Sequence, residues 1–307
     1  MHSKSSTCTG IEHKVQQRSP EWFSLRRNTL ITASQFGDAI GVGRGKPFDF
    51  FLSLISEDSI FEQDGNMMSN LQHGIDTEII IKEAYEMLTG NLVRDSGFWV
   101  PNKDSPLKTL IGASPDGLVV DRDCPENIIG LTEFKAPVHK MYSGNDLDMG
   151  IPRQYMAQIQ GQMAVVGAPW CDFLAVCTKT REIILKRVHF QPVYWFHVSD
   201  VIRQFCHTLQ ESQVREMFGQ DPTESLSAKK LRTLPMHRSK FPGEDSITVE
   251  DLLEQKDGMF RGPSMVFMSF DLLMGYPCNQ GNTSLNMDQV LERIDSQIHS
   301  TQQSQVV

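Results

Sequence analysis

Two neighbouring stretches of the 307-residue chain decide the fold prediction: ASPDGLVV at residues 113–120 and GLTEFKAP at residues 130–137. Each is a short apolar run bounded by Pro, Asp or Gly, which is typical of a β-strand. Side chains alternate between the two faces of a strand, so Glu133 and Lys135 point the same way. If the two strands pair, Asp116 lies beside them, and two carboxylates and an ammonium group meet at one place.

Those three groups suit the hydrolysis of a phosphodiester. Carboxylates such as Asp116 and Glu133 are ligands that Mg²⁺ and Mn²⁺ prefer. A bound metal ion lowers the pKa of a water and neutralises charge that develops on the phosphate. Lys135 can position the attacking water or help to deprotonate it. The alternative is a solvent-facing ion pair on a strand, because short motifs of this kind also match by chance.

Outward from these strands, the pattern predicts one α/β domain over residues 15–217. Residues 1–14 are expected to be a flexible N-terminus, and residues 218–307 a partly disordered extension with short helical fragments. Capping residues at Ser19 and Thr32 each predict the start of a helix. Apolar spacing predicts helices over 70–88, 152–166 and 193–218, and strands over 97–100, 108–113, 172–178 and 182–190.

Composition restricts the class of protein. The net charge of −9 argues against a nucleic-acid partner, but acids gathered around metal ions account for part of it, and local basic clusters matter more. The sequence contains no run of about 18 apolar residues, so no membrane span is expected. The six cysteines form no C-x-x-C pair, which favours a reducing intracellular compartment. The nucleus, the cytoplasm and a DNA-containing organelle all stay open.

Three further groups of polar residues surround the central motif. Glu78 lies in a predicted helix and can add a carboxylate to the centre. Gln154, Gln158 and Gln162 share one helix face at i, i+4 and i+8. Arginines, hydroxyls and free backbone N–H groups gather at 26–34, which suits a phosphate. Taken singly, these groups are equally compatible with solvated helix faces and ordinary capping.

Five blocks of the chain, in order, resemble the YqaJ/lambda-exonuclease family of viral-type recombinases within the PD-(D/E)xK nuclease superfamily. The blocks are EWFSLR…ITAS, HGIDTE, SPDG, EFK and YMAQIQ, and they extend over residues 17–190. The resemblance implies an α/β (α+β), restriction-endonuclease-like fold: a mixed central β-sheet flanked by helices. The chain has one residue more than the family pattern between Arg26 and the ITAS block.

The resemblance also implies roles for individual residues. Asp116, Glu133 and the backbone carbonyl of Phe134 become metal ligands, and Lys135 becomes the catalytic lysine. The remaining matches are Glu78 and Gln158 as supporting residues of the centre, Arg26, Ser34 and Ser114 as ligands of a 5′-terminal phosphate, and the loop Arg44 to Lys46 near the DNA path.

The activity implied is Mg²⁺-dependent degradation of one strand of linear double-stranded DNA, 5′ to 3′, in recombination or end processing. Mn²⁺ can substitute, and the lack of a cysteine quartet argues against an iron–sulfur cluster. A homo-oligomeric ring around DNA and a single-strand annealing protein as partner are implied by the family alone. Two alternatives stay open: an endonuclease on the same fold, and a catalytically inactive DNA-end-binding or annealing module.

Overall fold

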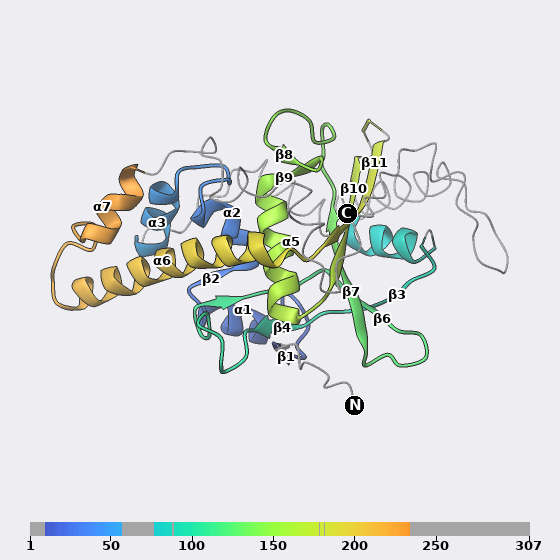
Figure 1. Ribbon diagram of the computed structural model, residues 1–307, viewed down its shortest axis with the longest axis horizontal. Helices are drawn as coiled ribbons and strands as arrows, with labels where there is room; N and C mark the ends of the chain where they lie inside the picture. Colours follow the sequence, from blue (N-terminus) through green and yellow to red (C-terminus); the bar gives the residue numbers. More distant parts are fainter. Residues whose placement is uncertain (1–9, 57–76, 88, 178, 181, 234–307) are drawn as a thin grey trace, which may run out of the picture.

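The computed structural model describes residues 10–56, 77–87, 89–177, 179–180 and 182–233. A five-stranded sheet runs through the molecule, with helices on both faces (Figure 1). The elements before the longest strands are β1 (Ile11–His13), α1 (Pro20–Arg27), β2 (Ile31–Thr32), η1 (Ala33–Gln35), α2 (Phe36–Ala39), α3 (Pro47–Ile55), β3 (Leu92–Arg94), β4 (Phe98–Val100) and β5 (Ile111–Gly112). They are followed by β6 (Gly117–Val120), β7 (Ile128–Lys135), β8 (Leu147–Asp148), β9 (Ile151–Pro152), α5 (Arg153–Val166), β10 (Trp170–Cys177), β11 (Glu182–His189), α6 (Pro192–Met217) and α7 (Leu226–Thr233).

The central sheet is mixed, which confirms the fold predicted from the sequence. Its strand order is β11-β10-β7-β6-β3. β7 and β10 are parallel, joined by a connection that contains α5, whereas the other neighbours are antiparallel. Parallel neighbours need such a crossover, and a helix is the usual solution. α5 therefore lies directly over the strands that carry the central motif.

Each face of the sheet buries a separate apolar cluster. On one face, α5 and α6 cover Leu131 and Phe173. On the other, a helix at residues 77–87 packs Ile81 and Tyr85 against Phe134 and other strand residues. Figure 1 shows α5 and this second helix on opposite sides of the strands. The alternation along β7 sends Glu133 and Lys135 to the α5 face, because the intervening Phe134 faces the other way.

The helix ends follow the capping signals in the sequence. The Ser19 side chain accepts a hydrogen bond from Trp22 N at 3.2 Å, and Pro20 occupies the first turn of α1. Thr32 forms a capping box with Gln35, although the helix that follows opens with a 3₁₀ turn. Gly41, with φ at 83°, follows α2. The starts predicted at Ser19 and Thr32 are therefore confirmed.

Two elements lie where irregular chain was expected. Residues 11–13 fall in the predicted flexible N-terminus but form β1, which pairs antiparallel with β4, while Glu12 holds Arg94 at 3.1 Å. α7 falls in the predicted extension, yet its Ala228 and Leu231 are buried in the core. The helical fragments predicted further along lie outside the described residues. Within the described part of the chain, no helix is both long and apolar enough to span a bilayer.

Candidate active site

The candidate active centre lies where β6 begins and β7 continues past it. The pairing of the two strands stops at Gly117 and Thr132. Beyond that point, the Phe134 backbone N–H donates to Asp116 Oδ2 at 2.7 Å, in place of a strand partner. The N–H and C=O of one strand residue point to the same side, so the Phe134 carbonyl faces this edge as well. The end of β6 therefore brings three oxygen-bearing groups together: the Asp116 carboxylate, the Phe134 carbonyl and the Glu133 carboxylate.

Glu133 is the most enclosed member of the centre. Its side chain is 1% exposed, so the solvent-facing ion pair does not apply to it. The Lys135 ammonium donates to Glu133 Oε1 and lies 4.9 Å from the ring centroid of Tyr155. Burial and the charge of Glu133 raise the pKa of Asp116 well above its usual value. Burial alone would lower the pKa of Lys135, but Glu133 and Asp116 outweigh it and raise this pKa.

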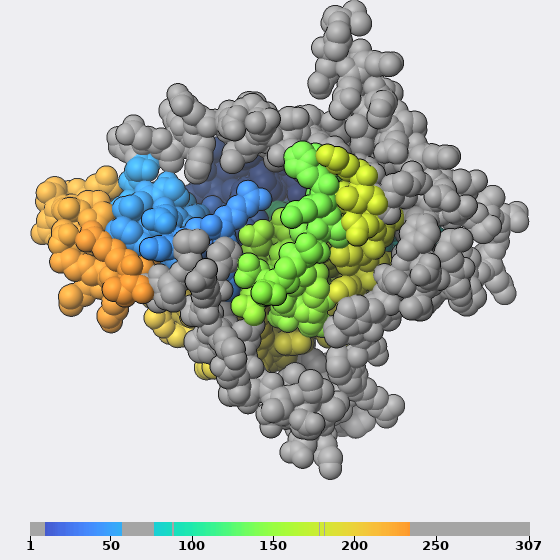
Figure 2. All heavy atoms as spheres, turned by 90° about the horizontal axis from the view of Figure 1, so that it is seen from above, coloured from blue at the N-terminus to red at the C-terminus, as the bar shows by residue number. Residues whose placement is uncertain are grey.

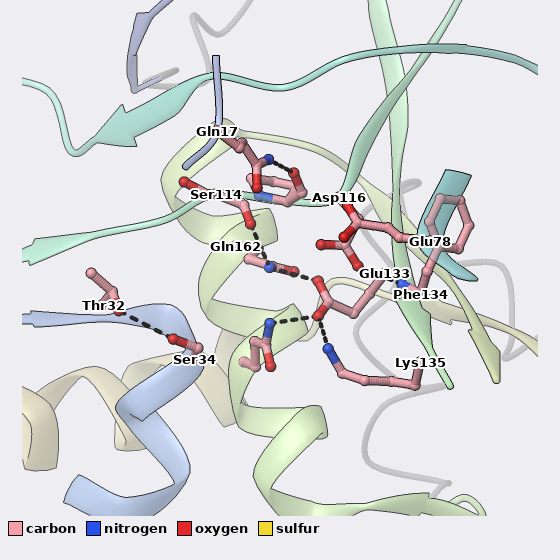
Figure 3. Close-up of polar contacts among 12 residues, drawn as sticks. Gln17, Thr32, Ser34, Glu78, Ser114, Asp116, Glu133, Phe134, Lys135 and Gln162 are labelled. Atoms are coloured by element: carbon pink, nitrogen blue, oxygen red, sulfur yellow. Dashed lines mark hydrogen bonds and ion pairs between the residues drawn. The ribbon is translucent and has the colours of Figure 1, made fainter. Parts of the chain in front are cut away.

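Two amides from α5 fix both oxygens of Glu133 (Figure 3). Gln158 Nε2 donates to Oε1 at 2.6 Å, and Gln162 Nε2 donates to Oε2 at 2.8 Å. Both glutamines are buried, so this part of the glutamine face is not a solvated stripe. Gln154 instead packs its Cβ close to Gly37. With a donor on each oxygen, the Glu133 carboxylate cannot rotate without losing a hydrogen bond.

The third carboxylate comes from the opposite face of the sheet. Glu78 extends from the helix at 77–87 toward Asp116 (Figure 3). Its Oε2 accepts a hydrogen bond from Arg18 Nη2 at 2.6 Å. The centre therefore holds three carboxylates, Glu78, Asp116 and Glu133, against two cations, Arg18 and Lys135, a net charge of −1.

This donor set fits a divalent cation. Asp116, Glu133 and the Phe134 carbonyl are hard oxygen ligands, as Mg²⁺ and Mn²⁺ prefer. Burial and the charge of Glu133 raise the pKa of Asp116, and a cation bound beside the two carboxylates would favour their ionised forms. Among the described residues, no group of three or more His, Cys, Asp or Glu side chains is arranged to hold a metal ion, so the Phe134 carbonyl would have to complete the donor set at this centre.

A second group of residues suits a phosphate. β2 and β5 are parallel, with Thr32 opposite Gly112, so Ser34 and Ser114, each two residues further on, leave the strands at the same end. Trp22 joins Ser114 to α1: its Nε1 donates to Ser114 Oγ at 2.8 Å, and the Arg26 guanidinium lies 4.5 Å from its ring centroid. No carboxylate in the described part of the chain pairs with Arg26, and burial lowers its pKa. Because the Arg26 guanidinium is half-buried and pairs with no carboxylate among the described residues, it is suited to an anionic ligand.

The basic loop faces the Lys135 side of the centre. Arg44 and Lys46 are exposed, and Arg44 N donates to Asp38 Oδ1 at 3.0 Å. Burial raises the pKa of Tyr142, and the charge of Arg44 opposes that rise, which places Arg44 near this phenol. Tyr142 in turn lies 5.6 Å, between ring centroids, from Tyr155. Seen from above, the surface is hollowed between the light-blue stretch containing α3 and the green stretch around β8 and β9 (Figure 2).

Gln162 shares the face of Gln158 one helical turn away, so the sequence periodicity selected both, although only Gln158 was assigned a role. Three other residues that contact the site were not selected from the sequence. Trp22 is one of them. Gln17, which donates to the Pro115 carbonyl at 2.8 Å, and Arg18 left no local signal, because their partners are far away in the sequence.

The fold and the site have the arrangement expected of a PD-(D/E)xK nuclease, with Pro115–Asp116 and Glu133-Phe134-Lys135 in the positions of the motif predicted from the sequence. More particularly, residues 21–169 match the model of the YqaJ-like viral recombinase domain.

Two crystal structures of an alkaline exonuclease (LHK-Exo) from Laribacter hongkongensis are similar to this chain, one of them in complex with dAMP. Both align at 24% sequence identity and a TM-score of 0.49, over 66% of this chain and 97% or 98% of theirs. No curated protein matches the chain.

Proposed function

We propose that this protein is a Mg²⁺-dependent DNA exonuclease that degrades one strand of linear duplex DNA from its 5′ end. One observation supports this above all: the phosphate-suited pocket and the carboxylate centre share a residue. Gln162 Nε2 donates to Glu133 and also lies 3.5 Å from the Ser114 carbonyl. A terminal phosphate held by Arg26, Ser34 and Ser114 would therefore sit next to the cleavage centre.

Asp116, Glu133 and the Phe134 carbonyl would hold the cation, which would polarise the scissile phosphate and lower the pKa of a water. The chain's own residues prepare the rest of the centre. Gln158 and Gln162 fix the orientation of Glu133, and the Lys135 ammonium stabilises negative charge that develops on the phosphate. Water positioned beside Lys135 is the nucleophile.

The experiment is a digestion assay on linear duplex DNA labelled at one end of one strand, with closed circular DNA alongside. We expect Mg²⁺ to support release of the 5′ label from linear DNA, EDTA to stop it, and circular DNA to stay intact. Cleavage of closed circles would favour the endonuclease alternative. Binding of linear DNA without any cleavage in Mg²⁺ or Mn²⁺ would favour the inactive end-binding module and contradict the proposal.

Removing the guanidinium of Arg26 is expected to weaken recognition of a 5′-phosphate. A charged hydrogen bond contributes about 1.5–3 kcal/mol, so Arg26→Ala should raise KM for 5′-phosphorylated ends roughly 10- to 100-fold. Ends with a 5′-hydroxyl should change little. The matched control is Arg27→Ala, which removes an exposed cation from the same turn of α1. Equal losses on both kinds of end would place Arg26 outside the phosphate pocket.

A further inference from the structure

Arg18 has a backbone conformation that is unusual for its residue type. Its φ is 66°, in the left-handed region that side-chain-bearing residues rarely adopt and that glycine adopts freely. Among the described residues, two other non-glycine residues have a positive φ, Thr109 and Met149. Strain of this kind persists only where surrounding contacts impose it, and it tends to occur at functional sites.

The contacts that impose it lie on both sides of Arg18. Before it, Gln17 Nε2 donates to the carbonyl of Pro115 at 2.8 Å and to that of Ser96 at 3.2 Å. After it, Ser19 caps α1 and its backbone N–H donates to Gln16 at 3.2 Å. The anchor at Pro115 is adjacent to Asp116 in the sequence, so the strained turn is attached to the active centre itself.

The strained turn directs the Arg18 side chain to Glu78. Arg18 Nη2 lies 2.6 Å from Glu78 Oε2, and the two side chains are 46% and 24% exposed. An ion pair so open to solvent stabilises a fold very little. Stability therefore does not account for a left-handed arginine at this position, whereas the location of Glu78 beside Asp116 suggests a role in the centre (Figure 3).

We infer that Arg18 is a positioning residue of the active centre, which keeps the Glu78 carboxylate turned toward Asp116. This rests on the proposed function. Without Arg18, and before a metal ion binds, three carboxylates face one another with Lys135 as the one cationic side chain beside them, and like-charge repulsion turns Glu78 away. Displacement of a supporting group from the productive geometry lowers the rate of the chemical step more than it lowers binding.

Arg18→Gly separates this role from a structural one, because glycine accepts the same φ without strain. We expect the melting temperature to stay level or rise by about 2 °C, while kcat falls roughly 10- to 100-fold and KM changes little. Arg18→Lys should restore part of the rate. In combination with Glu78→Gln, Arg18→Gly should cause no further loss, because both changes remove one interaction.

A crystal structure of Arg18→Gly provides a readout independent of activity. A Glu78 carboxylate displaced from Asp116 supports the inference, and an unmoved one overturns it, whether or not the protein cleaves DNA. A wild-type kcat in Arg18→Gly, or losses that multiply in the double variant, would overturn it too. Failure of the proposed function would look different. In that case the wild-type protein would cleave no more DNA than the Lys135→Met variant, which is expected to be inactive.

Discussion

Glu133→Gln is expected to reduce DNA cleavage by roughly a thousandfold or more, while linear DNA still binds. The change removes one of the two carboxylates suited to the cation and places an amide NH₂ where Glu133 accepts hydrogen bonds from Lys135, Gln158 and Gln162. Loss of one electrostatic group of an active centre typically costs about 10²–10³ in rate, and the metal site is lost with it. Single-turnover cleavage of 5′-phosphorylated linear DNA measures the effect.

Lys135→Met tests the same centre without altering the carboxylates and is expected to lose about as much activity. Its matched control is Lys108→Met, which removes an exposed lysine that lies outside the motif. Circular dichroism and a gel-shift assay would establish that each variant folds and binds DNA. Wild-type turnover in either Glu133→Gln or Lys135→Met would mean that DNA is cleaved at a site other than this centre.

Arg187→Met is expected to lower the free energy of unfolding by about 2–3 kcal/mol. Asp172, 4% exposed, accepts two hydrogen bonds from Arg187 at 2.8 Å and one from Tyr85 at 2.7 Å. Breaking a buried pair costs about 3–5 kcal/mol because it leaves an uncompensated charge. The lower figure applies here because Arg187 is 36% exposed.

Urea unfolding measures this loss, and Arg203→Met is the control. Arg203 pairs with Asp200 on the surface of α6, where both side chains are more than 40% exposed, so the midpoint should not move. Tyr85 lies on the helix that presents Glu78, so the Arg187 variant should also lose activity as that helix loosens. Equal midpoints for wild type and Arg187→Met would contradict the assignment of Asp172 as a buried anchor.

The parts of the fold predicted from the sequence are those that depend on neighbours in the chain. Ser19 and Thr32 cap their helices as expected, because capping is a contact over three residues. β1 was missed because its partners, β4 and Arg94, lie about 80 residues away. α7 was missed because its short apolar pattern is weak on its own and gains its stability from the core around Ala228 and Leu231.

The site divides in the same way. Glu133 and Lys135 follow from the two-residue period of one strand, and Gln158 from the period of one helix. The role of Arg18 could not be predicted from the sequence, because neither its positive φ nor its distant partner Glu78 is indicated by the neighbouring residues. Only the roles of these residues in catalysis stay predictions, to be decided by the variants above.

α5 contacts Glu133 through Gln158 and Gln162, two side chains one helical turn apart, and Gln162 also contacts the carbonyl of Ser114, a proposed phosphate ligand. Backbone hydrogen bonds hold that turn at about 5.4 Å along the axis, and the buried amides of Gln158 and Gln162 prevent the helix from sliding. In the proposed exonuclease, α5 would therefore fix the distance between a terminal phosphate and the bond to be cut. Each cut would then release a product of constant size, whatever the base sequence.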